Sequence, residues 1–123
     1  MAPEFPYSIN YEVAYGFLKL IDIEKIRSEV TQEWFNQTLC EVNDSVIRLG
    51  VIRGEFHWHK HDKEDEFFYV VDGTLYIDLE DRVVELKPRQ GFSVPRGMLH
   101  RTRAPERTTI LMVEPRSVVA TGD

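Results

Sequence analysis

The sequence predicts an all-β domain with one short helix near the amino terminus. From Thr38 onward, short runs of β-branched and aromatic residues are separated by turn signals such as Asn43-Asp44 and Asp72-Gly73. Before that, from Asp22 to Trp34, apolar residues recur at spacings of three and four, which is typical of a helix. A chain of 123 residues with 42% hydrophobic content can form one compact domain with a core and is too short for two ordinary ones.

The helix is predicted over residues 22–36, with Asp22 as its capping residue. Residues 1–21 form an N-terminal arm, rich in Tyr and Pro and without a clear period, which is either disordered or packs on a partner subunit. Residues 37–116 form the β-domain and residues 117–123 a C-terminal tail. The predicted strands are 37–42, 46–56, 57–61, 66–71, 74–79, 83–86, 91–94, 100–102 and 109–114. So many short strands indicate a small sandwich or barrel.

The charge and cysteine content exclude several classes of protein. With 15 basic and 21 acidic residues, the formal net charge of −6 repels phosphate backbones and anionic lipids, so we expect neither a nucleic acid nor a membrane partner. Cys40 is the only cysteine, which excludes an intrachain disulfide and a thiolate metal cluster. No apolar run approaches the roughly 20 residues of a bilayer span, and no secretion signal is recognisable, so a cytoplasmic location is expected.

Three of the four histidines alternate in the stretch HWHKHDKEDEFFYVVDG. In a strand, His57, His59 and His61 would share one face, and two adjacent imidazoles of such a row can converge on one ion. Glu66 can reach that ion from the following strand, and His100 is the remaining imidazole. Sheltering several imidazoles and a carboxylate together is costly unless an ion neutralises them, so the pattern favours a metal site over a packed or solvated histidine cluster.

These residues resemble the cupin superfamily, and specifically its small single-domain metal-binding members. The first motif of that family has Gly, His-x-His, three or four residues, Glu, six residues and Gly. Gly54, His59, His61, Glu66 and Gly73 match it, although Gly54 stands one place nearer the first His than usual. Pairing His57 with His59 instead would leave Val71 where the last Gly belongs.

The second cupin motif has Gly, five residues, Pro-x-Gly, two residues, His, three residues and Asn. Pro95, Gly97 and His100 match, whereas Arg89 replaces the first Gly and Ala104 replaces the Asn. The resemblance covers about residues 37–116 and implies a double-stranded β-helix, the jelly-roll or cupin barrel.

The resemblance also implies one divalent ion inside the barrel, held by His59, His61, Glu66 and His100. Nitrogen and carboxylate ligands suit Fe(II), Mn(II), Ni(II) and Zn(II). We expect Fe(II) or Mn(II) in the cell, and zinc or nickel in a purified sample is compatible with the same ligands. His57 is left over and is the candidate catalytic residue, as a proton shuttle or substrate contact. The alternatives are a partner of a ligand or a solvated histidine at the barrel mouth.

Two functions compete. The first is a metal-dependent enzyme, dioxygenase-like or isomerase- or epimerase-like, that acts on a small polar metabolite, with Arg48, Arg101 and Arg103 as candidate clamps for an anionic group. The second is a non-catalytic module that binds or senses a small molecule or the metal. We also expect a homodimer, because residues 46–56 and an arm containing Phe5, Tyr7, Tyr11 and Phe17 offer apolar edge surface.

Overall fold

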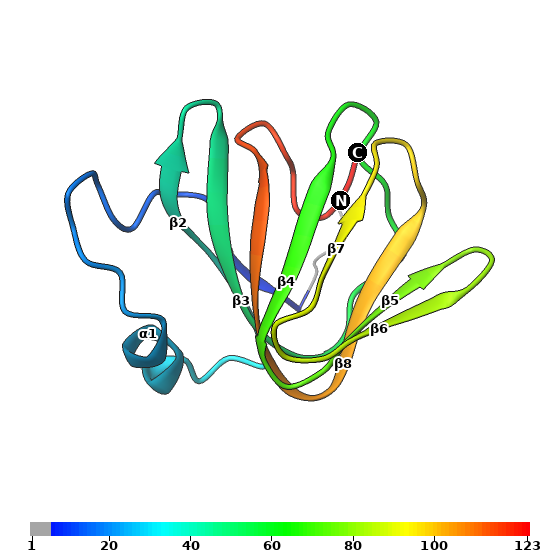
Figure 1. The fold of residues 1–123 in the computed structure, drawn as a ribbon, viewed down its shortest axis with the longest axis horizontal. Helices are drawn as coiled ribbons and strands as arrows, with labels where there is room; N and C mark the ends of the chain where they lie inside the picture. Colours follow the sequence, from blue (N-terminus) through cyan, green and yellow to red (C-terminus); the bar gives the residue numbers. More distant parts are fainter. Residues whose placement is uncertain (1–5) are drawn as a thin grey trace.

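The computed structural model describes residues 6–123 and confirms the prediction of an all-β jelly roll with one short helix (Figure 1). The strands are β1 (Ser8–Asn10), β2 (Trp34–Val42), β3 (Ser45–Glu55), β4 (Glu66–Asp72), β5 (Leu75–Leu79), β6 (Val83–Leu86), β7 (Gly91–Val94) and β8 (His100–Pro115). The helix α1 spans Ile23–Glu29. It is the only helix in this part of the chain, and it is far too short and polar to cross a bilayer.

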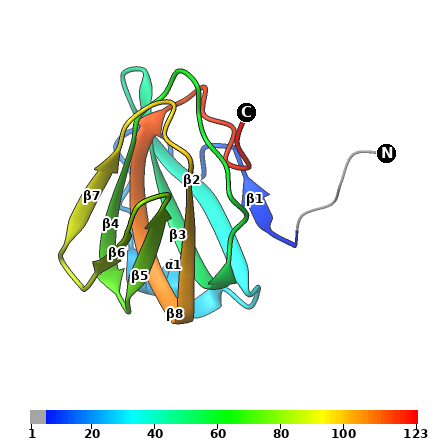
Figure 2. The same cartoon turned by 90° about the vertical axis from the view of Figure 1, so that its right-hand side faces the viewer.

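Strand β8 joins the two walls of the barrel. Its carboxyl-terminal half pairs with β3 and β4, in the order β1-β2-β3-β8-β4-β7, while its first residues pair with β5, which in turn pairs with β6. Figures 1 and 2 show β8 bending at the lower end and rising again in the opposite wall. The predicted break at residues 104–107 is therefore a bend within one strand, and the two strands predicted on either side of it are one.

The core lies between these walls. The side chains of β4 alternate, so that Phe68 and Val70 are buried while their neighbours are more exposed. Leu75 and Ile77 face them from β5 and are fully buried. Burial of an aliphatic side chain of this size stabilises the fold by about 1.5–3 kcal/mol. A second, smaller cluster around Leu49 lies on the outer face and is covered by α1 and the segment before it.

The helix is shorter than predicted, and Trp34 lies in β2 instead. The backbone leaves the helical region at Val30, which ends α1, and Trp34 pairs with Ile52 of β3. The β-branched pair Val30-Thr31 lowers helix propensity, and a ring buried against Tyr7 and Phe56 gains more from tertiary packing than from one further helical turn.

The predicted strand at residues 57–61 is also wrong. This segment is a loop along the edge of β8, and its only ladder contact is an isolated bridge between His59 and His100. The predicted alternation nevertheless holds over part of the segment, because Trp58 and Lys60 are exposed while His59 and His61 are buried.

Both ends of the chain contact the barrel. β1 pairs in parallel with the start of β2, so the predicted arm contributes a strand to the sheet. Tyr7 stacks on Phe56 of its own chain, and Tyr11 lies against Arg48, whereas Phe17 is 79% exposed. Phe5 lies outside the described residues. The C-terminal tail, red in Figure 1, enters the open end between the walls.

Two turns follow the family motifs in different ways. Gly73 has φ +88°, and a Cβ there would meet Thr108 Oγ1 at 2.5 Å, so this turn requires glycine. Arg89, which stands where the second motif has Gly, adopts φ +68°. The turn geometry is thus kept without the glycine, at the cost of a conformation that side chains rarely adopt.

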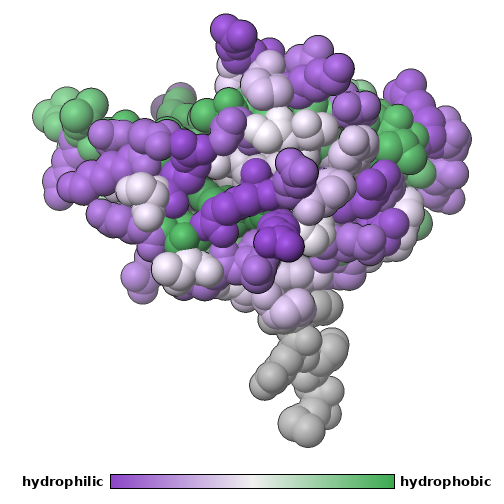
Figure 3. Space-filling model, turned by 90° about the horizontal axis from the view of Figure 1, so that it is seen from below, coloured by the Kyte–Doolittle hydropathy of each residue, from purple (hydrophilic) through white to green (hydrophobic). Residues whose placement is uncertain are grey.

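The closed lower end of the barrel carries no large apolar surface. Figure 3 views the molecule from below and shows hydrophilic residues over most of this face, with hydrophobic areas confined to small separate regions. The C-terminus lies at the opposite end (Figure 1), from which we expect access to the interior.

Candidate metal centre

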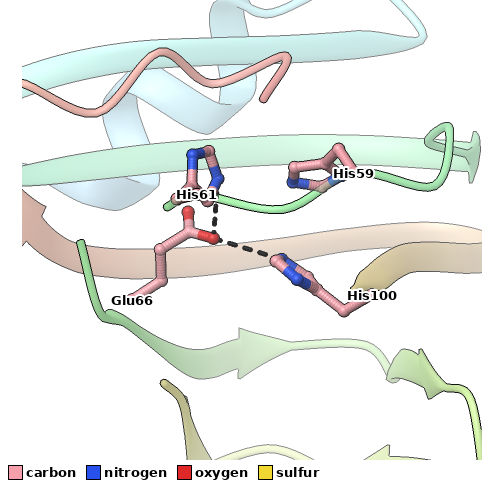
Figure 4. A group of neighbouring side chains, drawn as sticks. All are labelled: His59, His61, Glu66 and His100. Atoms are coloured by element: carbon pink, nitrogen blue, oxygen red, sulfur yellow. Dashed lines mark hydrogen bonds and ion pairs between the residues drawn. The ribbon is translucent and has the colours of Figure 1, made fainter. Parts of the chain in front are cut away.

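Four side chains from three segments meet inside the open end of the barrel (Figure 4). His59 and His61 come from the loop before β4, Glu66 is the first residue of β4, and His100 is the first residue of β8. All four are at most 9% exposed. One ligand atom from each lies within 4.8 Å of all the others. The structure therefore brings together the four residues that the family motifs predict.

Backbone pairing fixes these positions. His59 and His100 exchange two backbone hydrogen bonds of 2.9 Å, and the Gly97 amide donates to the carbonyl of His61 at 2.7 Å. Glu66 pairs with Val94 of β7. The histidine loop is thus held by the second motif, so the two motifs form one site.

The ring nitrogens of His59 and His100 are oriented by carbonyl groups. His59 Nδ1 donates to the His57 carbonyl at 3.0 Å, and His100 Nδ1 donates to the Met98 carbonyl at 2.9 Å. A carbonyl oxygen only accepts, so each Nδ1 carries the proton and the Nε2 of a neutral ring presents a lone pair. This is the arrangement that orients a metal-binding imidazole.

Glu66 lies between two of these lone-pair positions. Its Oε1 is 3.2 Å from His100 Nε2 and 3.0 Å from His61 Nε2. A neutral His100 cannot donate to both Met98 and Glu66. His61 Nε2 is within ion-pair distance of Glu66 Oε1 but lacks the geometry of a hydrogen bond. The Nδ1 atom of His61 has no hydrogen-bond partner among residues 6–123. A cation between the carboxylate and the nitrogens would satisfy these atoms, so the residues fit a metal.

The electrostatics favour the ligand form of His59 and Glu66 but not that of His61. Burial, and next the neighbouring His100, lower the pKa of His59 to about 4, which keeps this ring neutral at pH 7. Burial alone would raise the pKa of Glu66, but the imidazoles of His100 and His61 outweigh it and hold that pKa well below its usual value. Burial alone would lower the pKa of His61, and the Glu66 carboxylate more than offsets it, so that pKa is raised.

His57 lies outside this group. Its Nε2 is 2.6 Å from the Thr121 carbonyl of the tail, and its Nδ1 is 3.3 Å from the Tyr7 hydroxyl. The ring also stacks on Phe56. His57 therefore links the N-terminal arm to the C-terminal tail at the barrel mouth, and its catalytic role stays a prediction.

The three candidate arginine clamps are engaged elsewhere. Arg48 points into the barrel, where it pairs with Glu114. Arg101 and Arg103 both donate to Asp78, at 2.7 and 2.8 Å. Arg48 and Arg101 each use Nε and Nη1 in these contacts, whereas Arg103 uses only Nε, so the arginine clamp stays a prediction.

Sequence reasoning missed Glu114. It lies next to Glu66 across the β4–β8 pairing, where Phe67 faces Val113, and it is 2% exposed. Burial, and next the Glu66 carboxylate, raise the pKa of Glu114 well above its usual value. A sequence signal existed, because Glu114 interrupts the apolar run Ile110–Val113 at an inward-facing position of the last strand.

A narrow cavity adjoins the four residues. The space between its walls is about 430 Å³, a volume that includes open solvent. His59 and Glu66 line it together with Asn36, Glu114 and apolar side chains of the larger sheet, and Ala120 of the tail borders it.

With this geometry in place, comparison with known proteins identifies the family. The model of the cupin domain matches residues 48–114, more than half of the chain. The uncharacterized protein YdbB of Bacillus subtilis is 40% identical over 97 residues, which cover 78% of this chain and 86% of that protein. The chain therefore belongs to the cupin family.

Solved structures agree with this assignment. A cupin-2 domain protein of Shewanella frigidimarina has a TM-score of 0.74 at 33% identity, over 78% of this chain and 94% of that one. Protein NMB1881 of Neisseria meningitidis has a TM-score of 0.70 over 79% of this chain and 99% of that one, and at 18% identity it shows the fold alone.

Proposed function

We propose that this cupin is a metal-dependent enzyme that acts on a small metabolite inside the barrel. The observation that carries the proposal is the buried group of three imidazoles and one carboxylate, whose ligand atoms lie within 4.8 Å of one another. Such a group is costly to bury without an ion, and the Nδ1 hydrogen bonds of His59 and His100 leave the Nε2 lone pair of each ring available to an ion.

The residues of the chain have separate roles in this proposal. His59, His61, Glu66 and His100 would hold the ion, which when bound supplies a Lewis acid or a site for dioxygen. The carbonyls of His57 and Met98 fix the tautomers of two ligands. Phe56 and Phe68 exclude water from the adjoining cavity. His57 remains the candidate for proton transfer at the mouth.

The donor set limits the choice of metal. Three nitrogens and one carboxylate oxygen suit Fe(II), Mn(II), Ni(II) or Zn(II), and affinity order alone favours none of them in the cell. We propose Fe(II) or Mn(II) as the working metal.

The proposal is tested by turnover. Protein loaded with Fe(II) or with Mn(II) should convert at least one compound of a metabolite panel, and a His61→Ala variant should not. Stabilisation of the loaded protein by a compound that stays unconverted would favour the alternative, a non-catalytic binding module.

A further inference from the structure

The cavity beside the four ligand residues has mainly apolar walls. The apolar lining comprises Trp34, Ile52, Phe56, Phe68, Ile110 and Met112, drawn from strands of the larger sheet and from the loop that follows β3. Such walls favour a ligand whose body is a ring or a short carbon skeleton, because burial of apolar area supplies most of the binding free energy.

Two polar atoms in this lining are unsatisfied. Asn36 is 7% exposed and its Oδ1 has no hydrogen-bond partner among residues 6–123. Glu114 is 2% exposed, and while its Oε1 accepts from Arg48, its Oε2 meets no donor from the described part of the chain. A buried acceptor without a donor is costly, so Asn36 Oδ1 would gain from a ligand that donates a hydrogen bond. Burial and Glu66 raise the pKa of Glu114, so this side chain is a carboxylic acid that can itself donate.

The lining offers nothing comparable to an anion. No lysine or arginine lines the cavity, within the described residues. Arg48, the nearest buried cation on the inner face, is already bonded to Glu114, to the Thr38 hydroxyl and to the Val118 carbonyl. An anionic group placed near Asn36 would instead face the Glu114 carboxyl and an apolar wall.

We infer that the cavity selects a small, uncharged, largely apolar molecule that carries a hydroxyl group, and that Asn36 Oδ1 accepts the hydrogen bond from that hydroxyl. This inference rests on the proposed function, because the same cavity adjoins His59 and Glu66. The sequence suggests a small polar metabolite. The inference restricts the polar part of that metabolite to a hydrogen-bond donor.

Phenol and toluene test the inference because they have nearly the same shape and differ in the donor. Titrated into metal-free protein and followed by NMR at the methyl groups of Ile52, Ile110 and Met112, phenol should bind roughly 2- to 12-fold more tightly than toluene, the range expected for one net hydrogen bond. Benzoate should leave these methyl groups unshifted. Equal affinity for phenol and toluene, or benzoate binding in the cavity as tightly as phenol, would overturn the inference.

A variant locates the acceptor. Asn36→Leu should remove most of the preference for phenol over toluene. Gln37→Leu is the matched control, because Gln37 is the next residue of β2, lies outside the cavity lining and undergoes the same chemical change. A phenol preference that persists in Asn36→Leu would overturn the role of Asn36. If that variant does not fold, the comparison of ligands on the unaltered protein still decides the ligand class.

The metal content of the unaltered protein separates this inference from the proposed function. If the protein binds one ion per chain and shows no preference for phenol, the result supports the metal site and contradicts the inferred ligand class. If the protein prefers phenol at the cavity methyl groups and binds no ion, the result supports the inferred ligand class and contradicts the metal-dependent function.

Discussion

Arg48 donates a hydrogen bond of 2.8 Å to Glu114 inside the barrel, and the two side chains are 3% and 1% exposed. Arg48 also donates to Thr38 Oγ1 at 3.0 Å and to the Val118 carbonyl at 3.2 Å. On the other side, Glu114 neighbours Glu66. A polar row therefore crosses the inner face of the larger sheet and ends at the proposed metal ligands.

This ion pair predicts an asymmetric effect on stability. Arg48→Met leaves the Glu114 carboxyl buried beside Glu66 without its cation and should lower the free energy of unfolding by roughly 3–5 kcal/mol. The double variant Arg48→Met, Glu114→Gln should recover part of that loss, because it removes both charges. Urea denaturation measures both.

Arg53→Met is the control for this comparison. Arg53 lies on the same strand, is exposed, and approaches Glu33 only to 3.9 Å, so its replacement should change stability by less than about 1 kcal/mol. The account of the row fails if Arg48→Met is no more destabilising than Arg53→Met.

The parts of the fold predicted from sequence are those with a strong local signal. The strands at 83–86 and 91–94 have the predicted bounds, and the spacing from His59 to Glu66 and Gly73 places the ligands correctly. Trp34 was misplaced because its spacing from Val30 fits a helix, while its pairing with Ile52 depends on contacts distant in sequence.

For the site as well, the sequence predicts the features that have a local signal and misses those that depend on distant contacts. The motif spacing predicts which residues converge. The turn of the His57 ring toward Thr121 and Tyr7, however, depends on the two ends of the chain meeting at the barrel mouth, which no local pattern encodes. The pairing of Arg48 with Glu114, 66 residues apart, is equally hidden in the sequence.

Metal affinity should fall as the pH drops. A bound imidazole must be neutral, and protons compete with the ion for its lone pair. The pKa of His61 is raised above 6.5, so as the pH falls this ring takes up a proton before His59, whose pKa is lowered to about 4. Affinity should therefore begin to decline above pH 6.5 and continue to fall below it. Titration calorimetry with Mn(II) measures this affinity. If the affinity does not change between pH 8 and pH 5, the histidines are not the ligands.

We predict a homodimer, with a revised interface. β3 cannot offer a free edge, because β2 and β8 pair with it on both sides. The arm does offer apolar surface, since Phe17 and Leu20 are 79% and 88% exposed. Light scattering at high micromolar concentration should give the mass of two chains, and Phe17→Ser with Leu20→Ser should shift it toward one. An unaltered protein that stays monomeric would contradict the prediction.

His57→Ala should separate proton transfer from metal binding. The ring is not one of the four ligands, so metal content should stay near that of the unaltered protein. If His57 transfers a proton, activity should fall by roughly 10²–10⁴-fold. Val83→Ala, an exposed change on β6 outside the arm and the cavity lining, serves as the control for activity. Unchanged activity in His57→Ala would contradict a role of this histidine in proton transfer.

The central claim, one ion held by His59, His61, Glu66 and His100, is tested most directly by elemental analysis of protein purified without an affinity tag. The unaltered protein and His57→Ala should each contain close to one divalent ion per chain, whereas His61→Ala should contain almost none. Full occupancy in His61→Ala, or no metal in the unaltered protein after loading with Fe(II), Mn(II) or Zn(II), would contradict the account.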